Sequence, residues 1–244
     1  MIASCYQSQL AMIRKTKSLY QRTRQAVLLT LATCCVVIAA PSVRADTTLT
    51  STNFASAYQD VDVVKQAAER GLTDQVFNAL SSPDTSYDVR AAVVNALGWS
   101  FTGQHHAKTY LDYVASSHGK SSSALTIAEL TPEEMFSLGY LLAMDNYGNP
   151  QARLVPGENG EVEQANAVTL LDAVSNKLPD NFSVALIRSL VQARNAQISQ
   201  DWCGAYKIVA GVVKDFPGQQ NMRAQAVEIV MGYMASHQEY CSPT

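Results

Sequence analysis

Two adjacent histidines, His105-His106, are the side chains of this sequence best suited to acid–base chemistry, and Asp112 and His118 follow on the same predicted helix. Adjacent helical residues point about 100° apart, so the pair does not readily chelate one ion. A metal site needs three or four converging ligands, and no HExxH-like spacing occurs. We therefore predict no metal site, and we keep as an alternative an enzyme that uses His105, His106 and dispersed carboxylates.

Acidic residues gather around the longest predicted loop. Asp145–Asn149 superficially resembles a calcium loop, but the alternating acids and closing Glu of an EF-hand are missing. Glu158, Glu161 and Glu163 could act as paired carboxylates, although exposed acidic surface is the ordinary interpretation in an acidic protein. The sequence also lacks a G-x-S-x-G motif and a glycine-rich phosphate loop. We predict no catalytic residues and no cofactor.

The first 45 residues have the pattern of a secretory signal peptide. They contain no acidic residue and six basic ones, followed by the apolar run Ala26–Ala40. Val43 and Ala45 then occupy the positions that a signal peptidase reads. The pattern predicts cleavage after Ala45 and a periplasmic or secreted protein.

Two other interpretations of this N-terminal region remain. A retained membrane anchor would need about 20 apolar residues, whereas the run has 15 and ends at Pro41. Lipidation would use Cys34 or Cys35, but both lie in the middle of the apolar run. Translation starts at Met1 or at Met12, which would give a signal of more ordinary length.

Removal of residues 1–45 leaves 12 basic and 21 acidic residues, a net charge of −9. An acidic surface repels nucleic acid and anionic membranes. The charge excludes nucleic acid as a partner, predicts no membrane association after cleavage, and favours neutral or basic protein or peptide partners.

Only two of the five cysteines, Cys203 and Cys241, remain in the predicted mature chain. An even pair in an oxidising compartment indicates one disulfide, and two free thiols are the alternative. The disulfide would hold the C-terminal end against the helix that carries Cys203.

Helical periodicity follows almost everywhere from Asn53 onward, after a polar stretch at 46–52 that predicts a flexible leader. Apolar residues three and four apart predict about nine helices in one all-α domain over 53–244. The first is expected to run from Phe54 to Gly71. Start signals stand at Thr73, at Thr131-Pro132 with Glu134, and at Ser199.

One long insertion, 145–162, interrupts the helices. Arg153–Val155 and Glu161–Glu163 flank its second turn and are expected to pair as a small β-hairpin. Long loops in compact proteins are commonly functional, so this insertion is a candidate specificity element.

Three helices share one frame of a small residue, two apolar residues and a helix breaker. The frames are Ala107-x3-Leu111-x2-Val114-x4-Gly119, Ala167-x3-Leu171-x2-Val174-x4-Pro179 and Ala205-x3-Val209-x2-Val212-x4-Pro217. The frame resembles the second helix of a tetratricopeptide repeat. The resemblance implies stacked antiparallel helical hairpins, that is, an α-solenoid. Asp88–Gly98 also resembles a HEAT-repeat helix, so another α-solenoid is an alternative, as is a closed helical bundle.

A tetratricopeptide-like protein implies an extended surface that binds peptides or partner domains. Aromatic side chains in such a groove can anchor a partner, and we take as candidates Trp99, Phe101, Tyr110, Tyr140 and Tyr147. Core packing is the alternative role for them. The resulting hypothesis is a non-catalytic exported interaction module, such as a scaffold, assembly or secretion accessory factor. A small-ligand-binding helical bundle is the second hypothesis.

Overall fold

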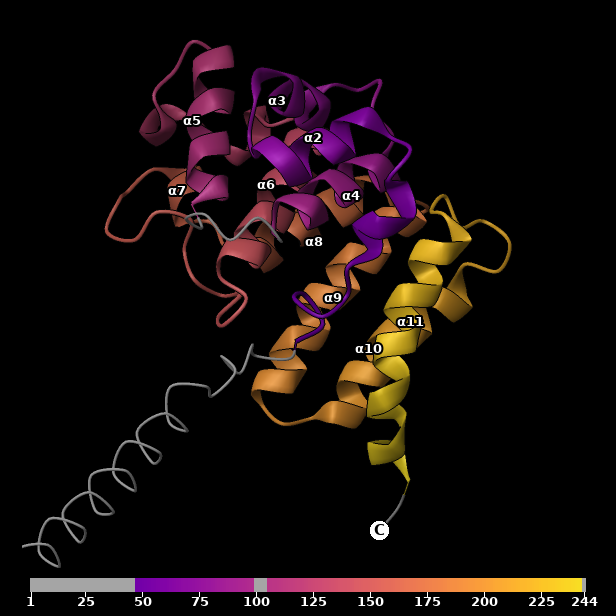
Figure 1. The fold of residues 1–244 in the computed structure, drawn as a ribbon. Coiled ribbons are helices and arrows are strands. Elements are labelled where there is room, and N and C mark those ends of the chain that lie inside the picture. The colour runs from indigo at the N-terminus through magenta and orange to yellow at the C-terminus, as the bar shows by residue number, and fades with distance from the viewer. Residues whose placement is uncertain (1–46, 99–104, 243–244) are drawn as a thin grey trace, which may run out of the picture. The chain divides into compact units, whose positions relative to one another are not determined.

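In the described part of the chain, residues 47–98 and 105–242 of a computed structural model, helices joined by loops form the fold (Figure 1). It contains ten α-helices, four 3₁₀ helices and no strand within these residues, which confirms the all-α prediction. The elements are η1 Phe54–Tyr58, α2 Asp62–Arg70, α3 Asp74–Ser81, α4 Tyr87–Leu97, α5 His106–Ser117, η2 Ser122–Ala124, η3 Ile127–Glu129, α6 Pro132–Asp145, α7 Glu161–Gln164, α8 Ala167–Lys177, α9 Phe182–Ile198, α10 Trp202–Asp215, α11 Ala224–Gln238 and η4 Glu239–Cys241.

Side-chain caps begin several helices where the sequence predicts them. Thr131 starts α6 with a full capping box: its hydroxyl accepts from the backbone N–H of Glu134, and the Glu134 carboxylate accepts from the backbone N–H of Thr131. Thr73 caps α3 with a single bond, in which its hydroxyl accepts from the backbone N–H of Val76. The cap of α10 differs from the prediction: Asp201, not Ser199, accepts from Gly204 N–H at 2.7 Å. Ser199 instead ends α9, because Gln200 turns the chain with a φ of 61°.

The single helix expected from Phe54 to Gly71 is two elements in the structure. The short helix η1 ends at Tyr58, and α2 begins at Asp62. The backbone N–H of Val61 donates to the Tyr58 carbonyl, which closes a turn between them. Both segments keep buried apolar residues, so the predicted apolar face is retained although the helix is interrupted between Tyr58 and Asp62.

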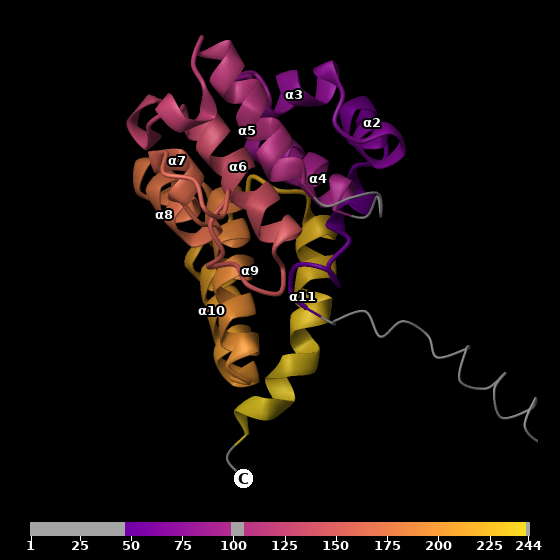
Figure 2. The ribbon, with the colours of Figure 1, turned by 90° about the vertical axis from the view of Figure 1, so that its left-hand side faces the viewer.

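Three helices, α4, α6 and α9, contact one another and form the centre of the helical unit (Figures 1 and 2). Arg90–Leu97 in α4 and Glu134–Met144 in α6 are buried at every position, as expected of helices surrounded on all sides. Gly139 permits the close contact of α6 with α8, because a Cβ atom there would lie 3.0 Å from Leu171 Cγ. From α5 onward each long helix packs on the next long helix of the chain.

The predicted β-hairpin in the insertion does not form. Glu161–Gln164 is the one-turn helix α7, and a single antiparallel bridge joins Arg153 to Asn166. The helical turn is favoured because the Glu163 carboxylate accepts from Gly160 N–H at 3.1 Å. Leu154 N–H still donates to the Ala165 carbonyl, so the insertion is held to the start of α8.

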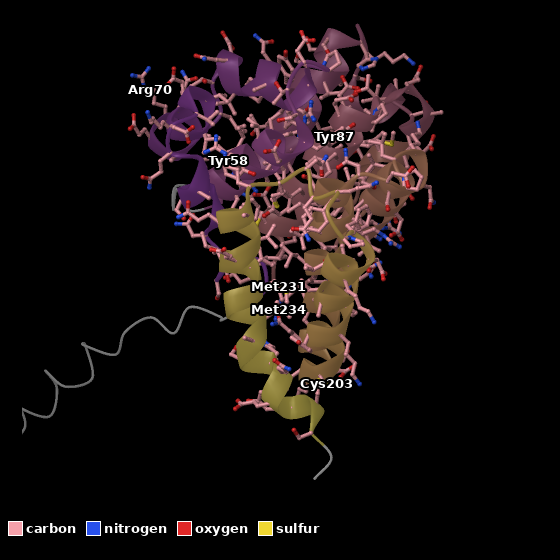
Figure 3. The ribbon with its side chains drawn as sticks, turned by 90° about the vertical axis from the view of Figure 1, so that its right-hand side faces the viewer. Tyr58, Arg70, Tyr87, Cys203, Met231 and Met234 are labelled. Carbon is pink, nitrogen blue, oxygen red and sulfur yellow. A yellow bond between two sulfur atoms is a disulfide. The ribbon has the colours of Figure 1, made fainter. Side chains whose placement is uncertain are left out.

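The Cys203–Cys241 pair predicted from the sequence is confirmed. The two sulfur atoms lie 2.17 Å apart and the two Cα atoms 4.8 Å apart. Figure 3 labels Cys203 in α10, near the C-terminal end of α11. The bond joins α10 to η4, which limits fraying of the C-terminal helix.

Residues 47–52, predicted to be a flexible leader, are packed against the helices instead. Thr47, Thr48, Leu49 and Thr52 are each 0% exposed. This segment and η1 lie along α9, α4 and α11 (Figure 1). We call Thr47–Tyr58 the strap. Its composition is polar, but its hydroxyls and main-chain groups find partners on the helices, and composition alone does not register such long-range contacts.

The predicted signal peptide, residues 1–45, lies outside the described residues. Within the described part of the chain, no helix combines the length and the hydrophobicity needed to cross a bilayer.

Candidate functional site

The predicted acid–base pair lies where the end of α6 meets the start of α5. One Asp145 oxygen accepts from Ala107 N–H at 2.8 Å, and the other lies 3.7 Å from His106 Nδ1. Burial raises the pKa of the Asp145 carboxyl, while the Ala107 N–H and His106 oppose the shift. Asp145 therefore caps the N-terminus of α5, where the His105 side chain makes no cap bond.

A hollow of about 300 Å³ opens beside this pair. The residues that line it are His105, Ala107, Lys108, Leu142, Asp145, Asn146, Ala152, Arg153, Leu154 and Pro156. Among these described lining residues, none carries a hydroxyl or thiol nucleophile, and the Asp145 carboxylate is occupied by the cap. Within the described residues, no three His, Cys, Asp or Glu side chains are placed to hold a metal ion.

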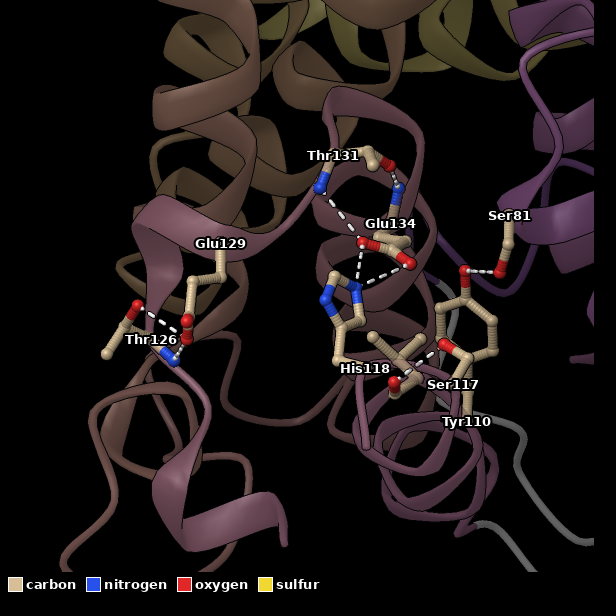
Figure 4. Close-up of polar contacts among 9 residues, drawn as sticks. Ser81, Tyr110, Ser117, His118, Thr126, Glu129, Thr131 and Glu134 are labelled. Atoms are coloured by element: carbon tan, nitrogen blue, oxygen red, sulfur yellow. Dashed lines mark hydrogen bonds and ion pairs between the residues drawn. The ribbon is translucent and has the colours of Figure 1, made fainter. Parts of the chain in front are cut away.

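A second histidine–carboxylate pair, which the sequence did not suggest, joins the end of α5 to the start of α6 (Figure 4). His118 Nε2 lies 3.2 Å from both oxygens of Glu134. The neighbouring Ser117 hydroxyl donates to the Val114 carbonyl at 2.7 Å and is not bonded to the imidazole. The geometry is that of an inter-helix joint without a nucleophile. The only sequence feature that could have pointed to this pair was Glu134 of the capping box, because its carboxylate has lone pairs beyond those that the cap uses.

The acidic cluster of the insertion does not form a carboxylate pair. Glu158 and Glu161 are exposed, whereas Glu163 is buried and accepts from the Ser122 hydroxyl at 2.7 Å. Glu163 has the role of a structural anchor between α7 and η2.

The aromatic residues predicted to bind a partner are mostly in the core. Tyr110 and Tyr140 are fully buried, so neither can meet a partner, which corrects that prediction. Their hydroxyls are satisfied internally, Tyr110 by Ser81 at 2.8 Å. Tyr147 is half-buried beside the core, and its carbonyl accepts from the Arg194 guanidinium. Trp99 and Phe101 lie outside the described residues.

A fully buried cation, Arg90 of α4, is a feature that sequence reasoning missed. Its Nε donates to the Leu80 carbonyl at 3.0 Å and its Nη2 to the Ser82 carbonyl at 2.6 Å. These carbonyls belong to the C-terminal end of α3, where the helix dipole favours positive charge. The guanidinium also lies 4.8 Å from the centre of the Tyr87 ring, and its burial lowers the pKa of Arg90. It fixes α3 to the centre of the fold.

Two buried amide side chains hold the main chain of the strap. Asn95 of α4 accepts from Ala55 N–H at 2.9 Å and donates to the Thr52 carbonyl at 3.1 Å. Gln197 of α9 accepts from Thr48 N–H at 3.1 Å. An amide that bonds backbone groups binds a segment without depending on its side chains, and this is the property required of a polypeptide-binding surface.

The other end of the strap is anchored by Arg223, which precedes α11. Its guanidinium donates to the Ala57 carbonyl at 2.8 Å and to Asp60, and lies 4.5 Å from the centre of the Tyr58 ring. The Tyr58 hydroxyl donates to Asp88 at 3.1 Å, and burial raises the pKa of Tyr58. Figure 3 labels Tyr58 near the upper end of α11.

Side chains also define the strap surface. Leu49, Phe54 and Tyr58 are each 0% exposed, and the Thr48 hydroxyl donates to the Leu190 carbonyl at 2.9 Å. The surface formed by α4, α9 and the start of α11 thus combines main-chain-directed amides with places where apolar side chains of the strap are buried. We call it the strap site. No protein-family model, no curated protein and no solved structure matches this chain.

Proposed function

We propose that this protein is a non-catalytic, exported interaction module that binds short polypeptide segments of partner proteins at the strap site. The observation that supports the proposal is the docked strap itself: Asn95 and Gln197 bond its main chain through buried amides. A segment from a partner offers the same backbone donors and acceptors. In an exported compartment such a protein would act as a scaffold, assembly or secretion accessory factor.

The chemistry of the strap indicates which partner segments fit. Thr47–Tyr58 contains no charged residue, and it buries hydroxyl, leucine and aromatic side chains. A neutral segment with a leucine and an aromatic residue five positions later would bury these side chains where Leu49 and Phe54 are buried. This agrees with the preference for neutral or basic partners that the charge of −9 implies.

The tetratricopeptide-like α-solenoid remains part of the proposal. Its support is that the nine small and apolar frame positions of α5, α8 and α10 are buried or half-buried, and that α5, α6, α8, α9, α10 and α11 pack in chain order. In this arrangement α6 and α9 would be the first helices of successive hairpins with α8 and α10, whereas α4, among the α-helices, packs mainly on α2 and α6. The strap would cover part of the face that α4 and α9 present.

The experiment asks whether a separate peptide with the strap sequence binds the strap site after the chain's own strap has been cut off. A protease site inserted between Gln59 and Asp60, both exposed, allows the strap to be cut in the folded chain that starts at Asp46. After cleavage and dilution, a fluorescent peptide of residues 46–58 is expected to bind saturably, measured by anisotropy. A peptide with Leu49→Asp is the matched control and should bind at least tenfold more weakly, because Leu49 is fully buried.

A second variant separates binding from folding. Gln197→Ala in the cut protein should weaken binding of the strap peptide and leave the helical circular dichroism signal unchanged. No saturable binding to a cut protein that keeps its helical signal, or equal binding of both peptides, would refute the proposed function.

A further inference from the structure

The strap meets a polar cluster in which Gln197 of α9 and His237 of α11 are buried, Tyr233 of α11 is half-buried and Ser236 of α11 is exposed. Gln197 and His237 are only 3% and 5% exposed. The backbone N–H of Thr48 can only donate, so the Gln197 atom that faces it at 3.1 Å must be the oxygen. The amide nitrogen of Gln197 then points to His237 Nε2 at 2.9 Å and to the Tyr233 hydroxyl at 3.2 Å.

This arrangement fixes the protonation state of the His237 ring. Because the Gln197 amide nitrogen donates, His237 Nε2 must accept and therefore carries no proton. His237 Nδ1 lies 3.0 Å from Ser236 Oγ, whose own proton goes to the Tyr233 carbonyl at 2.8 Å. Ser236 Oγ thus accepts from Nδ1–H. The docked strap corresponds to a neutral imidazole with its single proton on Nδ1.

A second proton on His237 is incompatible with the docked strap. Nε2–H would face the N–H groups of Gln197, so the amide would have to turn its oxygen toward the ring. The amide nitrogen would then face Thr48 N–H, donor against donor. Thr48 is 0% exposed, so its N–H would be left buried without an acceptor.

The groups around the ring do not offset this conflict. Trp202 of α10 lies 5.3 Å and Tyr233 5.0 Å from the ring, centroid to centroid, and Tyr240 of η4 contacts Trp202. A cation close to this cluster is Arg194 of α9, which interacts electrostatically with Tyr233. Among the ion pairs of the described residues, none joins His237 to a carboxylate. The flip of Gln197 is therefore the available response to protonation.

We propose that protonation of His237 releases the strap from α9, with the Gln197 amide as the relay, so that acidification uncovers the strap site. This regulation rests on the proposed function, in which the same surface receives a partner segment. The neutral ring keeps the chain's own segment in place, and the protonated ring makes the surface available.

We call the contact of His237, Gln197 and Thr48 the latch. Hydrogen–deuterium exchange of the strap amides tests it in the chain that starts at Asp46. Protection factors for residues 47–55, normalised to an unfolded-chain reference, are measured from about pH 8 to about pH 5, where histidine titrates. Protection is expected to fall about tenfold or more on acidification, the factor for one lost buried hydrogen bond. His237→Phe keeps the ring packing and should remove the pH step. His118→Gln, which changes the histidine that contacts Glu134 between α5 and α6, should retain the pH step.

Gln197→Met provides a second test that leaves His237 in place and removes the amide, together with its bond from Thr48 N–H. Strap protection should then be lower at every pH and show no pH step. Uniform protection in the unmodified chain, or a step that persists in His237→Phe or Gln197→Met, would overturn the latch. The readout follows the chain's own amides and needs no partner. Failure of the strap-peptide experiment at about neutral pH overturns the proposed function alone, and uniform strap protection overturns only the latch.

Discussion

Replacement of Arg90 by methionine tests how a fully buried cation stabilises this fold. The change keeps most of the side-chain volume and removes the hydrogen bonds to the Leu80 and Ser82 carbonyls. Leu80 keeps one partner, because the Ser137 hydroxyl also donates to its carbonyl at 2.7 Å. The Ser82 carbonyl also keeps one partner, because the backbone N–H of Thr85 donates to it at 3.2 Å.

The expected loss follows from two opposing effects. Hydrogen bonds from a charged donor contribute about 1.5–3 kcal/mol each, so two of them give about 3–6 kcal/mol. Removal of a buried charge that has no carboxylate partner returns part of this, because its desolvation cost disappears. We expect Arg90→Met to lower the free energy of unfolding by about 2–4 kcal/mol, and Arg90→Ala to lower it further through the cavity it leaves.

Urea unfolding followed by circular dichroism measures this change. With an m-value of about 2 kcal/mol/M, the midpoint should fall by about 1–2 M. Arg188→Met is the matched control in α9: Arg188 pairs with Asp172 at 2.5 Å, but both side chains are more than a third exposed. That variant should lose less than about 1 kcal/mol. A midpoint for Arg90→Met equal to that of Arg188→Met would refute the reasoning.

Asp145→Asn should reduce the pH dependence of stability. Burial raises the folded-state pKa of Asp145, so its contribution to stability is full below the unfolded-state pKa and is lost as pH rises through the folded-state pKa. Asparagine keeps an acceptor for Ala107 N–H, so the urea midpoint of the variant should decline less between about pH 4 and about pH 7 than that of the unmodified chain. An equal decline would contradict the assignment. Gly139→Ala should lower the free energy of unfolding by about 1–2 kcal/mol, because its Cβ would lie 3.0 Å from a leucine of α8. Gly211→Ala in α10, with no atom within 4 Å of the new Cβ, should instead raise it by up to about 1 kcal/mol, and the same sign for both would contradict the close contact of α6 and α8.

The helices and their caps were accessible from the sequence because they depend on residues a few positions apart. The Thr131 capping box and the Thr73 cap are local hydrogen bonds between groups three residues apart. The boundary near Ser199 was misplaced because Asp201 two residues later offers an equally good cap. The same limit applies to Phe54–Gly71, where apolar spacing alone does not reveal a turn inside a periodic segment.

The candidate sites were less accessible, since each joins segments that are far apart in the chain. Tyr110 and Tyr140 looked suited to a binding groove, but their hydroxyls find partners inside the core, so burial is permitted. The sequence does not distinguish Arg90 from an ordinary charged position of an amphipathic helix. Its burial depends on the orientation of the C-terminal carbonyls of α3, which no sequence pattern specifies.

The sequence by itself determined the all-helical class, through apolar periodicity and capping residues, and the Cys203–Cys241 pair, through the small number of cysteines left after residue 45. Tertiary structure alone decided that the strap docks. Thr48 bonds Gln197 across 149 positions, and Arg223 bonds Tyr58 across 165. A polar segment is buried only if its donors and acceptors all meet partners, and which distant groups meet is set by the packing of the whole helical unit.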